Sequence, residues 1–191
     1  MFNDFKHRHT PCIVGGDPEA VVLSRETKAT TIIGKEYIYN GLFAPTSVVS
    51  TGLAVEVEDT LYLTQTMRLT TDRDKYCSLL KTNVTAEIQR YTQEYDSNDN
   101  PKGNPEFSQV QVVRGFAQFV SAQLRLEDPG LLPTTTYILI LQTTVDIRRP
   151  EDKYLISPDR VLLNGRPHQV DAIDDLKYPN LFHVQLSEDM R

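Results

Sequence analysis

The sequence predicts a mainly β protein with little helix, and three observations support this prediction. Threonine, valine, isoleucine and tyrosine occur in short runs that turn-forming residues separate. Several runs alternate apolar with polar side chains, as a strand with one buried face does. The turn pair Asn164-Gly165 stands between two such runs, which is typical of a β-hairpin.

In the first half of the chain we expect short strands joined by tight turns. Gly34-Lys35 separates two of the runs, and Asn40-Gly41 is expected to end that pair. Glu58-Asp59 separates two alternating runs, as the turn of a tight hairpin would. The strands expected here are residues 20–23, 30–33, 36–39, 53–57 and 60–64.

The stretch from Asp72 to Asp96 fits two patterns. Its apolar residues are compatible with a helical stripe, but Val84, Ala86 and Ile88 also alternate as in a strand. Residues 96–105 are dense in Asp, Asn, Pro and Gly, which favour a long polar loop. We therefore expect a strand over residues 83–94, with a short helical turn possible within residues 72–80.

The second half contains the most apolar strand, expected over residues 134–145 and at the centre of its sheet. A long strand is predicted from Val110 to Val120, bent by a bulge at Gly115. A hairpin is expected near the end of the chain, because Leu162-Leu163 and Val170 flank the Asn164-Gly165 turn, and the last strand is expected over residues 182–186.

Length and composition limit the possible classes of function. The 191 residues fit one generous domain or two small ones, with enough chain for a substantial core. Twenty-six acidic against twenty basic residues give a net charge of −6, which argues against clamping a phosphate backbone. Cys12 and Cys77 are expected to be reduced thiols, and the start lacks a secretory apolar segment. We expect a soluble product of the cytoplasm with no membrane partner.

Two groups of side chains could carry chemistry. Asp171, Asp174 and Asp175 are close enough to suggest a carboxylate site, although a solvated turn explains them better. His7, His9 and Cys12 have a spacing compatible with zinc, but a fourth ligand would have to come from distant Cys77, His168 or His183. An N-terminal strand with a polar face explains the same residues. We expect no metal and no cofactor.

Other clusters are equally weak as sites. Arg148, Arg149, Arg160 and Arg166 form the only basic group and could contact DNA or an acidic partner. Tyr37, Tyr39, Phe116 and Phe119 could form a stacking platform, but cross-strand packing is the ordinary role of such residues. No nucleophile motif or phosphate-binding loop occurs. We therefore expect no enzyme, and a function in assembly.

A short internal similarity hints at duplication. Residues 75–79 and 177–181 share the spacing Lys-Tyr-x-x-Leu, and each follows an expected strand pair and precedes an alternating strand. A five-residue match arises easily by chance, so it suggests a repeated β-unit and no more.

Residues 84–189 resemble the head–tail joining proteins of tailed bacteriophages, the head-closure or stopper components of the neck. The resemblance rests on Asp99-Asn100 after a strand, Gly115-Phe116-Ala117-Gln118, Asp159, Asn164-Gly165 and Val170. The chain departs from the family pattern at His168, where the family often has an aromatic residue, and in its additional first eighty residues.

The resemblance implies a small antiparallel β-barrel or sandwich over residues 81–191, with residues 1–80 as an N-terminal β-rich elaboration. It also implies a cyclic homo-oligomer of six or twelve subunits in the virion neck, assembled in the cytoplasm of the host bacterium. Its partners would be a portal or adaptor protein on one side, a tail terminator or tail protein on the other, and double-stranded DNA in the lumen.

The same resemblance implies which residues matter. The candidate channel or gating loop is Asn98, Asp99, Asn100, Pro101, Lys102 and Gly103, whose composition suits a mobile element. The candidate fold-defining turn positions are Gly115, Asp159, Asn164 and Gly165.

Two rival functions stay open. A tail terminator or another tail-associated ring protein would also be rich in strands. A ligand- or sugar-binding β-sandwich is the rival from another class, and it would require an aromatic patch on its surface.

Overall fold

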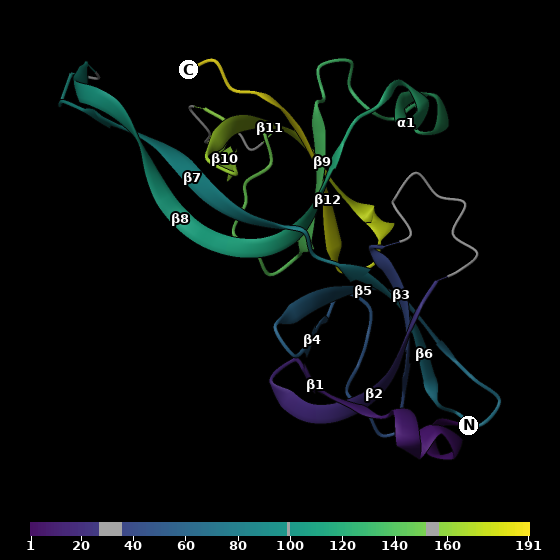
Figure 1. Ribbon diagram of the computed structural model, residues 1–191. Helices are drawn as coiled ribbons and strands as arrows, with labels where there is room; N and C mark the ends of the chain where they lie inside the picture. The colour runs from purple at the N-terminus through teal and green to yellow at the C-terminus, as the bar shows by residue number, and fades with distance from the viewer. Residues whose placement is uncertain (27–35, 99, 152–156) are drawn as a thin grey trace.

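Two closed antiparallel barrels, each of six strands, make up the part of the chain that the structure describes (Figure 1). The structure is a computed structural model and describes residues 1–26, 36–98, 100–151 and 157–191. The prediction of a mainly β protein with little helix is confirmed. Among the described residues, no helix is both long and apolar enough to cross a membrane.

The first barrel has the strand order β1-β2-β3-β6-β5-β4. A 3₁₀ helix, η1 (Phe2–Arg8), precedes it and packs beside β2. The strands are β1 (Thr10–Val14), β2 (Asp17–Arg25), β3 (Ile38–Phe43), β4 (Ala54–Val57), β5 (Thr60–Leu69) and β6 (Lys75–Lys81).

The second barrel has the strand order β7-β8-β9-β12-β11-β10. A short helix, α1 (Ala122–Glu127), follows β8 and begins at Ser121, whose side chain accepts a hydrogen bond from Leu124 N. The strands are β7 (Val84–Tyr95), β8 (Pro101–Phe119), β9 (Tyr137–Gln142), β10 (Arg160–Leu163), β11 (Arg166–Tyr178) and β12 (Leu181–Glu188).

The two barrels repeat one topology strand for strand. In the first, Gln65 bulges out of the β5–β6 pairing between Thr64 and Thr66. In the second, Asp171 bulges out of the β11–β12 pairing between Val170 and Ala172. These two bulges lie at corresponding positions, and the pairings on the other strands also match in register. A bulge is a specific feature, so its recurrence supports a duplicated β-unit.

The Lys-Tyr-x-x-Leu similarity does not mark this repeat. Lys75 begins β6, whose counterpart is β12, whereas Lys177 and Tyr178 end β11. By strand register, Lys75 corresponds to Phe182. Lys75 pairs with Phe43 of β3, and Phe182 pairs with Leu141, the equivalent position of β9. The repeat is therefore real in topology, but the five-residue match is accidental.

Alternating residues fill the interior of each barrel. The first core contains Val14, Val21, Phe43, Val55 and Leu79, all fully buried. The second core is built in the same way and contains Ala86, Ile88, Leu139, Leu141, Val161, Val170, Val184 and Leu186. Because side chains alternate between the two faces of a strand, every second residue points inward.

Several strand predictions in the first barrel need correction. Asn40-Gly41 does not end a strand, because β3 continues through it to Phe43. Residues 72–80 contain no helical turn of the expected kind, since β6 begins at Lys75 after the turn over residues 70–74. The hairpin across Glu58-Asp59 is confirmed. The strand expected at residues 30–33 lies outside the described residues.

The second barrel also corrects two predictions. Gly115 is not at a bulge: it pairs regularly with Val84, and the bulge in β8 falls at Val110. Gly115 serves a steric purpose, because a Cβ there would lie 2.6 Å from Leu141 Cδ2 and 2.9 Å from the Ile140 carbonyl oxygen. The Asn164-Gly165 hairpin is confirmed, with positive φ at both residues as a type I′ turn requires.

A short linker joins the barrels. Thr82 N and Oγ1 both donate to the Leu61 carbonyl oxygen in the first barrel. The Asn83 side chain bonds both backbone groups of Ala117 in the second barrel, at 2.7 and 2.8 Å. Each linker residue is thus fixed to a different barrel, which restricts the angle between the barrels.

The barrels also share a small apolar cluster. Leu63 and Leu80 of the first barrel pack with Phe116, Ile140 and Leu181 of the second. Beside this cluster the backbones approach closely at Gly52. There the Asn180 side chain donates to the Thr51 carbonyl oxygen at 3.2 Å, and Gln142 Nε2 donates to the Gly52 carbonyl oxygen at 2.9 Å.

We predict that Gly52→Ala destabilises the protein by about 3 kcal/mol. A Cβ at Gly52 would lie 2.3 Å from Asn180 Cβ and 2.5 Å from the Asn180 carbonyl oxygen, and the φ of +84° is itself unfavourable for alanine. Urea denaturation followed by circular dichroism measures the loss, because the chain has no tryptophan.

Gly16→Ala is the matched control. Gly16 has a φ of +101° but nothing within 4 Å of its would-be Cβ, so only the backbone term, about 1 kcal/mol, applies. Equal losses in the two variants would show that the barrels do not meet at Gly52.

Candidate functional site

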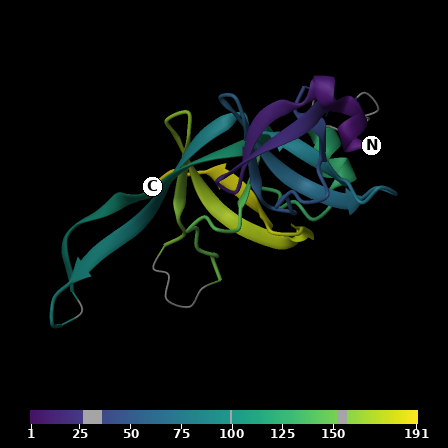
Figure 2. The same ribbon diagram turned by 90° about the horizontal axis from the view of Figure 1, so that it is seen from below.

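The most prominent feature of the surface is a hairpin that projects from the second barrel (Figures 1 and 2). Strand β7 pairs with β10 only as far as Gln89, and β8 pairs with β9 only from Phe116 onward. Residues 90–109 therefore extend beyond the barrel wall, and we call them the arm. Among the described residues, the strands of the arm pair only with each other.

The turn at the end of the arm is well organised. The Asp96 Oδ1 accepts hydrogen bonds from Asn98 N and Asn100 N at 2.8 and 2.9 Å. These bonds, those of Asn100 first, lower the pKa of the Asp96 carboxyl. Asp96 N in turn donates to the Asn100 carbonyl oxygen, so the side chain and the backbone close the same turn.

The loop predicted over residues 96–105 is shorter than expected. Strand β8 begins at Pro101, which pairs with Tyr95, and Lys102 pairs with Glu94. Of the candidate gating residues, Asn98 and Asn100 lie in the turn, whereas Pro101, Lys102 and Gly103 lie in β8; Asp99 lies outside the described residues. Cross-strand hydrogen bonds thus continue into a segment whose composition predicts a loop.

A charged cluster holds the base of the arm. Arg90 donates to the fully buried Asp159 at 3.2 and 3.1 Å, and to the exposed Asp146 at 2.9 and 3.1 Å. Asp159 also accepts from Arg148 N at 2.9 Å. The bonds to Asp146 first, and then those to Asp159, raise the pKa of the Arg90 guanidinium. The same contact lowers the pKa of Asp146.

A second cluster covers the outer face of the arm base. The guanidinium of Arg160 lies over the Phe107 ring at 3.6 Å, and that of Arg191 at 5.2 Å. Both arginines bond the buried Asp189 at 2.8 Å. Burial by itself raises the pKa of Asp189, but the bonds from Arg191 and Arg160 outweigh it and hold the pKa below its ordinary value.

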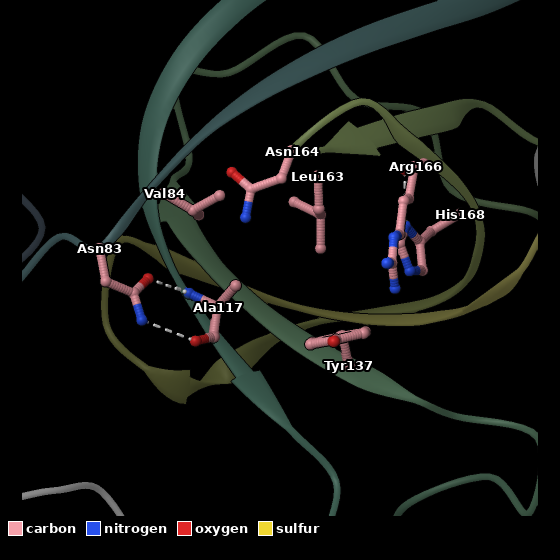
Figure 3. Close-up of a pocket in the computed structure, with 8 residues that line it drawn as sticks. All are labelled: Asn83, Val84, Ala117, Tyr137, Leu163, Asn164, Arg166 and His168. Carbon is pink, nitrogen blue, oxygen red and sulfur yellow. Dashed lines mark hydrogen bonds between the residues drawn. The ribbon is translucent and has the colours of Figure 1, made fainter.

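A pocket of about 370 Å³ opens at the end of the second barrel nearest the linker (Figure 3). Asn83 and Ala117 form one side of it, with their two hydrogen bonds, and Arg166 stands beside His168 on the other. His168 is buried, and its Nδ1 donates to the Arg166 carbonyl oxygen at 2.9 Å, which fixes the ring. Tyr137 packs edge-on against that ring with centroids 5.2 Å apart.

The three aspartates considered as a carboxylate site do not converge. All lie on β11, not in a connection between strands. Asp171 accepts from Ser187 Oγ at 2.9 Å, Asp174 accepts from Leu176 N and Lys177 N, and Asp175 pairs with Arg149. The expectation of a solvated turn is also wrong for Asp171, which is the bulge residue of a strand.

The possible zinc ligands are also separated. The N-terminal strand expected over His7 and His9 does not form there, because His7 lies in the 3₁₀ helix η1, His9 follows that helix, and β1 begins at Thr10. His9 stacks on Phe2, while Cys12 is buried in the first core. Burial raises the pKa of Cys12 to about 11 and that of Cys77 to about 12. Within the described ranges, no three His, Cys, Asp or Glu side chains are grouped as ligands.

The basic and aromatic groups disperse in the same way. Arg149 pairs with Asp175 and Arg160 with Asp189, so neither forms a basic surface with Arg166. Of the four aromatic residues considered as a platform, Tyr37 packs against Phe116 at the junction of the barrels. Tyr39 contacts Tyr62, and Phe119 contacts Tyr137. These four residues therefore lie against different partners and form no common platform.

The clusters at the arm base were missed by reasoning from sequence. Asp159 was singled out as a turn position, but its partner Arg90 is 69 positions away along the chain. Phe107 and Asp189 carry no local signal either. A buried carboxylate needs a cation or several hydrogen bonds, but the sequence does not say which arginine supplies them.

No protein-family model matches this chain, and no curated protein is significantly similar to it in sequence.

We predict that Arg90→Gln lowers the free energy of unfolding by about 3 kcal/mol, because it leaves the Asp159 carboxylate buried with only a backbone partner. Arg149→Gln is the control: it removes an exposed ion pair and should cost less than about 1 kcal/mol. Denaturation in urea measures both. Similar small losses would mean that the Arg90–Asp159 contact does not hold the arm.

We also predict a pH dependence that comes from His183 on β12. Burial, and then Lys177, lower the pKa of His183 from 6.5 to about 4. The unfolded chain therefore binds a proton at a pH where the folded chain does not, and stability falls as pH drops from about 6.5 to about 4. The loss should be about 3 kcal/mol.

His183→Gln should remove most of this loss, since glutamine does not titrate. Denaturation of both proteins at pH 7, 5.5 and 4.5 provides the comparison. Below about pH 4, Asp146 and Asp189, whose pKa values are lowered in the folded state, add a further loss common to both proteins. Parallel curves between pH 6.5 and 4 would contradict the prediction.

Proposed function

We propose that this chain is a structural subunit of the neck of a tailed bacteriophage, a head–tail connector or stopper that forms a ring. In this role it joins the head to the tail, and DNA passes through the ring or is held back by it. The arm is the observation that carries the proposal, together with the resemblance of residues 84–189 to head–tail joining proteins.

The physical reason starts from barrel closure. In a closed barrel, each strand has hydrogen-bonded neighbours on both sides, so the wall offers no free edge to another subunit. The arm has two outer edges, because its strands pair only with each other among the described residues. An element that reaches away from a compact body is suited to contact a neighbouring subunit in a ring.

The clusters at the arm base support the same role. Arg90 with Asp159 on one side, and Phe107 beneath Arg160 on the other, hold the arm at a defined angle to the barrel. A rigid projection loses less conformational freedom when it binds than a flexible one does. The assignment of residues 98–103 to a gate in the channel stays a prediction, as does their contact with DNA.

Removal of the arm in a phage that carries this gene tests the proposal. Asn-Gly in place of residues 92–106 would join Tyr91 to Phe107, which are paired, through a two-residue turn. The base clusters remain, so the purified variant should melt within a few degrees of the wild type. We expect filled heads that lose their DNA and do not acquire tails.

A control of unchanged arm length carries Thr92→Ser, which keeps the hydroxyl that donates to the Glu106 carbonyl oxygen, and it should give normal particles. Electron microscopy of the particles, with an antibody against this chain, provides the second readout. The proposed function would be ruled out if particles that carry the arm-deletion variant are infectious. It would also be ruled out if the antibody does not detect the chain in the neck.

A further inference from the structure

The pocket at the end of the second barrel arises from differences between the two repeats. By strand register, Ala117 of the second barrel corresponds to Leu23 of the first. His168 corresponds in the same way to Tyr62, which is 5% exposed and packs edge-on against Tyr39. At these two positions the second barrel has smaller side chains than the first. Ala117 and His168 both line the pocket of about 370 Å³.

The lining of the pocket indicates what it can bind. Val84, Ala117, Leu163 and the Tyr137 ring supply apolar surface. Arg166 stands where the first barrel has Thr60, and no partner of its guanidinium is found among the described residues. A guanidinium at the mouth of an apolar pocket suits a carboxylate that lies next to an apolar or aromatic group.

The end of the arm carries this combination of groups. Tyr95 is 47% exposed, and it lies between Glu94 and Asp96. Glu94 is exposed as well, and the bonds of the turn, those of Asn100 first, lower the pKa of Asp96. The pocket and the arm tip are therefore complementary in charge, and the apolar part of the pocket lining can contact the exposed aromatic ring of the tip.

The arm cannot reach the pocket of its own molecule. The pocket is lined by Val84, the first residue of β7, whereas Tyr95 is the last residue of the same strand. At about 3.3 Å per residue, the two are roughly 36 Å apart along a single strand. Any contact between arm tip and pocket must join two molecules, head to tail, and such contacts generate rings when the rotation closes.

We infer that the arm tip of one copy of this chain docks in the Arg166 pocket of a neighbouring copy, with Tyr95 in the apolar part and Glu94 paired with Arg166. The inference rests on the proposed function, because it specifies the contact that would build the proposed ring. In this arrangement the arm tip lies at the contact between subunits, which is an alternative to the predicted gating position in the channel.

A charge swap on the full chain tests the docking. Arg166→Glu and Glu94→Arg should each weaken self-association about tenfold or more, because each places like charges in the contact. The double variant carries the reversed pair and should recover most of the wild-type association. Sedimentation velocity over a range of concentrations measures the association.

Lys6→Glu and Glu151→Arg are the matched controls. They make the same charge changes at exposed positions outside residues 90–109 and outside the pocket lining, and they should associate like the wild type. Circular dichroism and melting temperature check that each variant is folded. Tyr95→Ala should also weaken association, whereas Leu69→Ala, which removes an apolar side chain that is 62% exposed, should not.

Three results of these association measurements would contradict the docking. A wild-type chain that stays monomeric at high concentration would overturn it, and so would single variants that associate normally or a double variant without recovery. These results leave the proposed function standing if the chain is still found in the neck. Conversely, the charge swap could behave as expected while the chain is absent from the neck. That result would refute the proposed function but not the docking.

Discussion

Backbone hydrogen bonding closes each sheet of this protein on itself, and this closure determines where the chain can meet another molecule. A strand at the open edge of a sheet exposes unpaired N–H and C=O groups, which can recruit further strands without control. Both barrels remove such edges from the body of the protein. Among the described residues, the arm is a hairpin outside both barrels. It carries Pro101 and Lys102 near its tip, residue types that discourage unwanted edge pairing.

The charged clusters follow from this arrangement. A hairpin outside a barrel has no core of its own, and an isolated two-stranded hairpin is marginally stable in water. Here Arg90 and Phe107 tie the arm to the barrel through the buried carboxylates Asp159 and Asp189 and the cations around them. A buried carboxylate is costly if it loses its partner, so these contacts favour one orientation of the arm over others.

Much of the β-structure could be predicted from alternation and turn chemistry, as the hairpins at Glu58-Asp59 and Asn164-Gly165 show. The incorrect predictions of secondary structure and of contacts have physical causes. Asn40-Gly41 has the composition of a turn, but Gly41 lies within β3, where a Cβ would contact Leu79 and Phe43 at 2.8 Å. Pro101 and Lys102 have the composition of a loop, yet they pair with Tyr95 and Glu94 of β7. The partner of Asp159 could not be found, because pairing across 69 residues leaves no local pattern.

The central claim is that closed barrels leave the arm as the means by which one copy contacts the next. The most direct measurement is an experimental structure of the assembled wild-type chain at a resolution that shows side chains. The account predicts that each arm crosses to the adjacent subunit and places Tyr95 in its pocket. An assembly that is held together by the barrel walls, with every arm extended into solvent or into the channel, would contradict it.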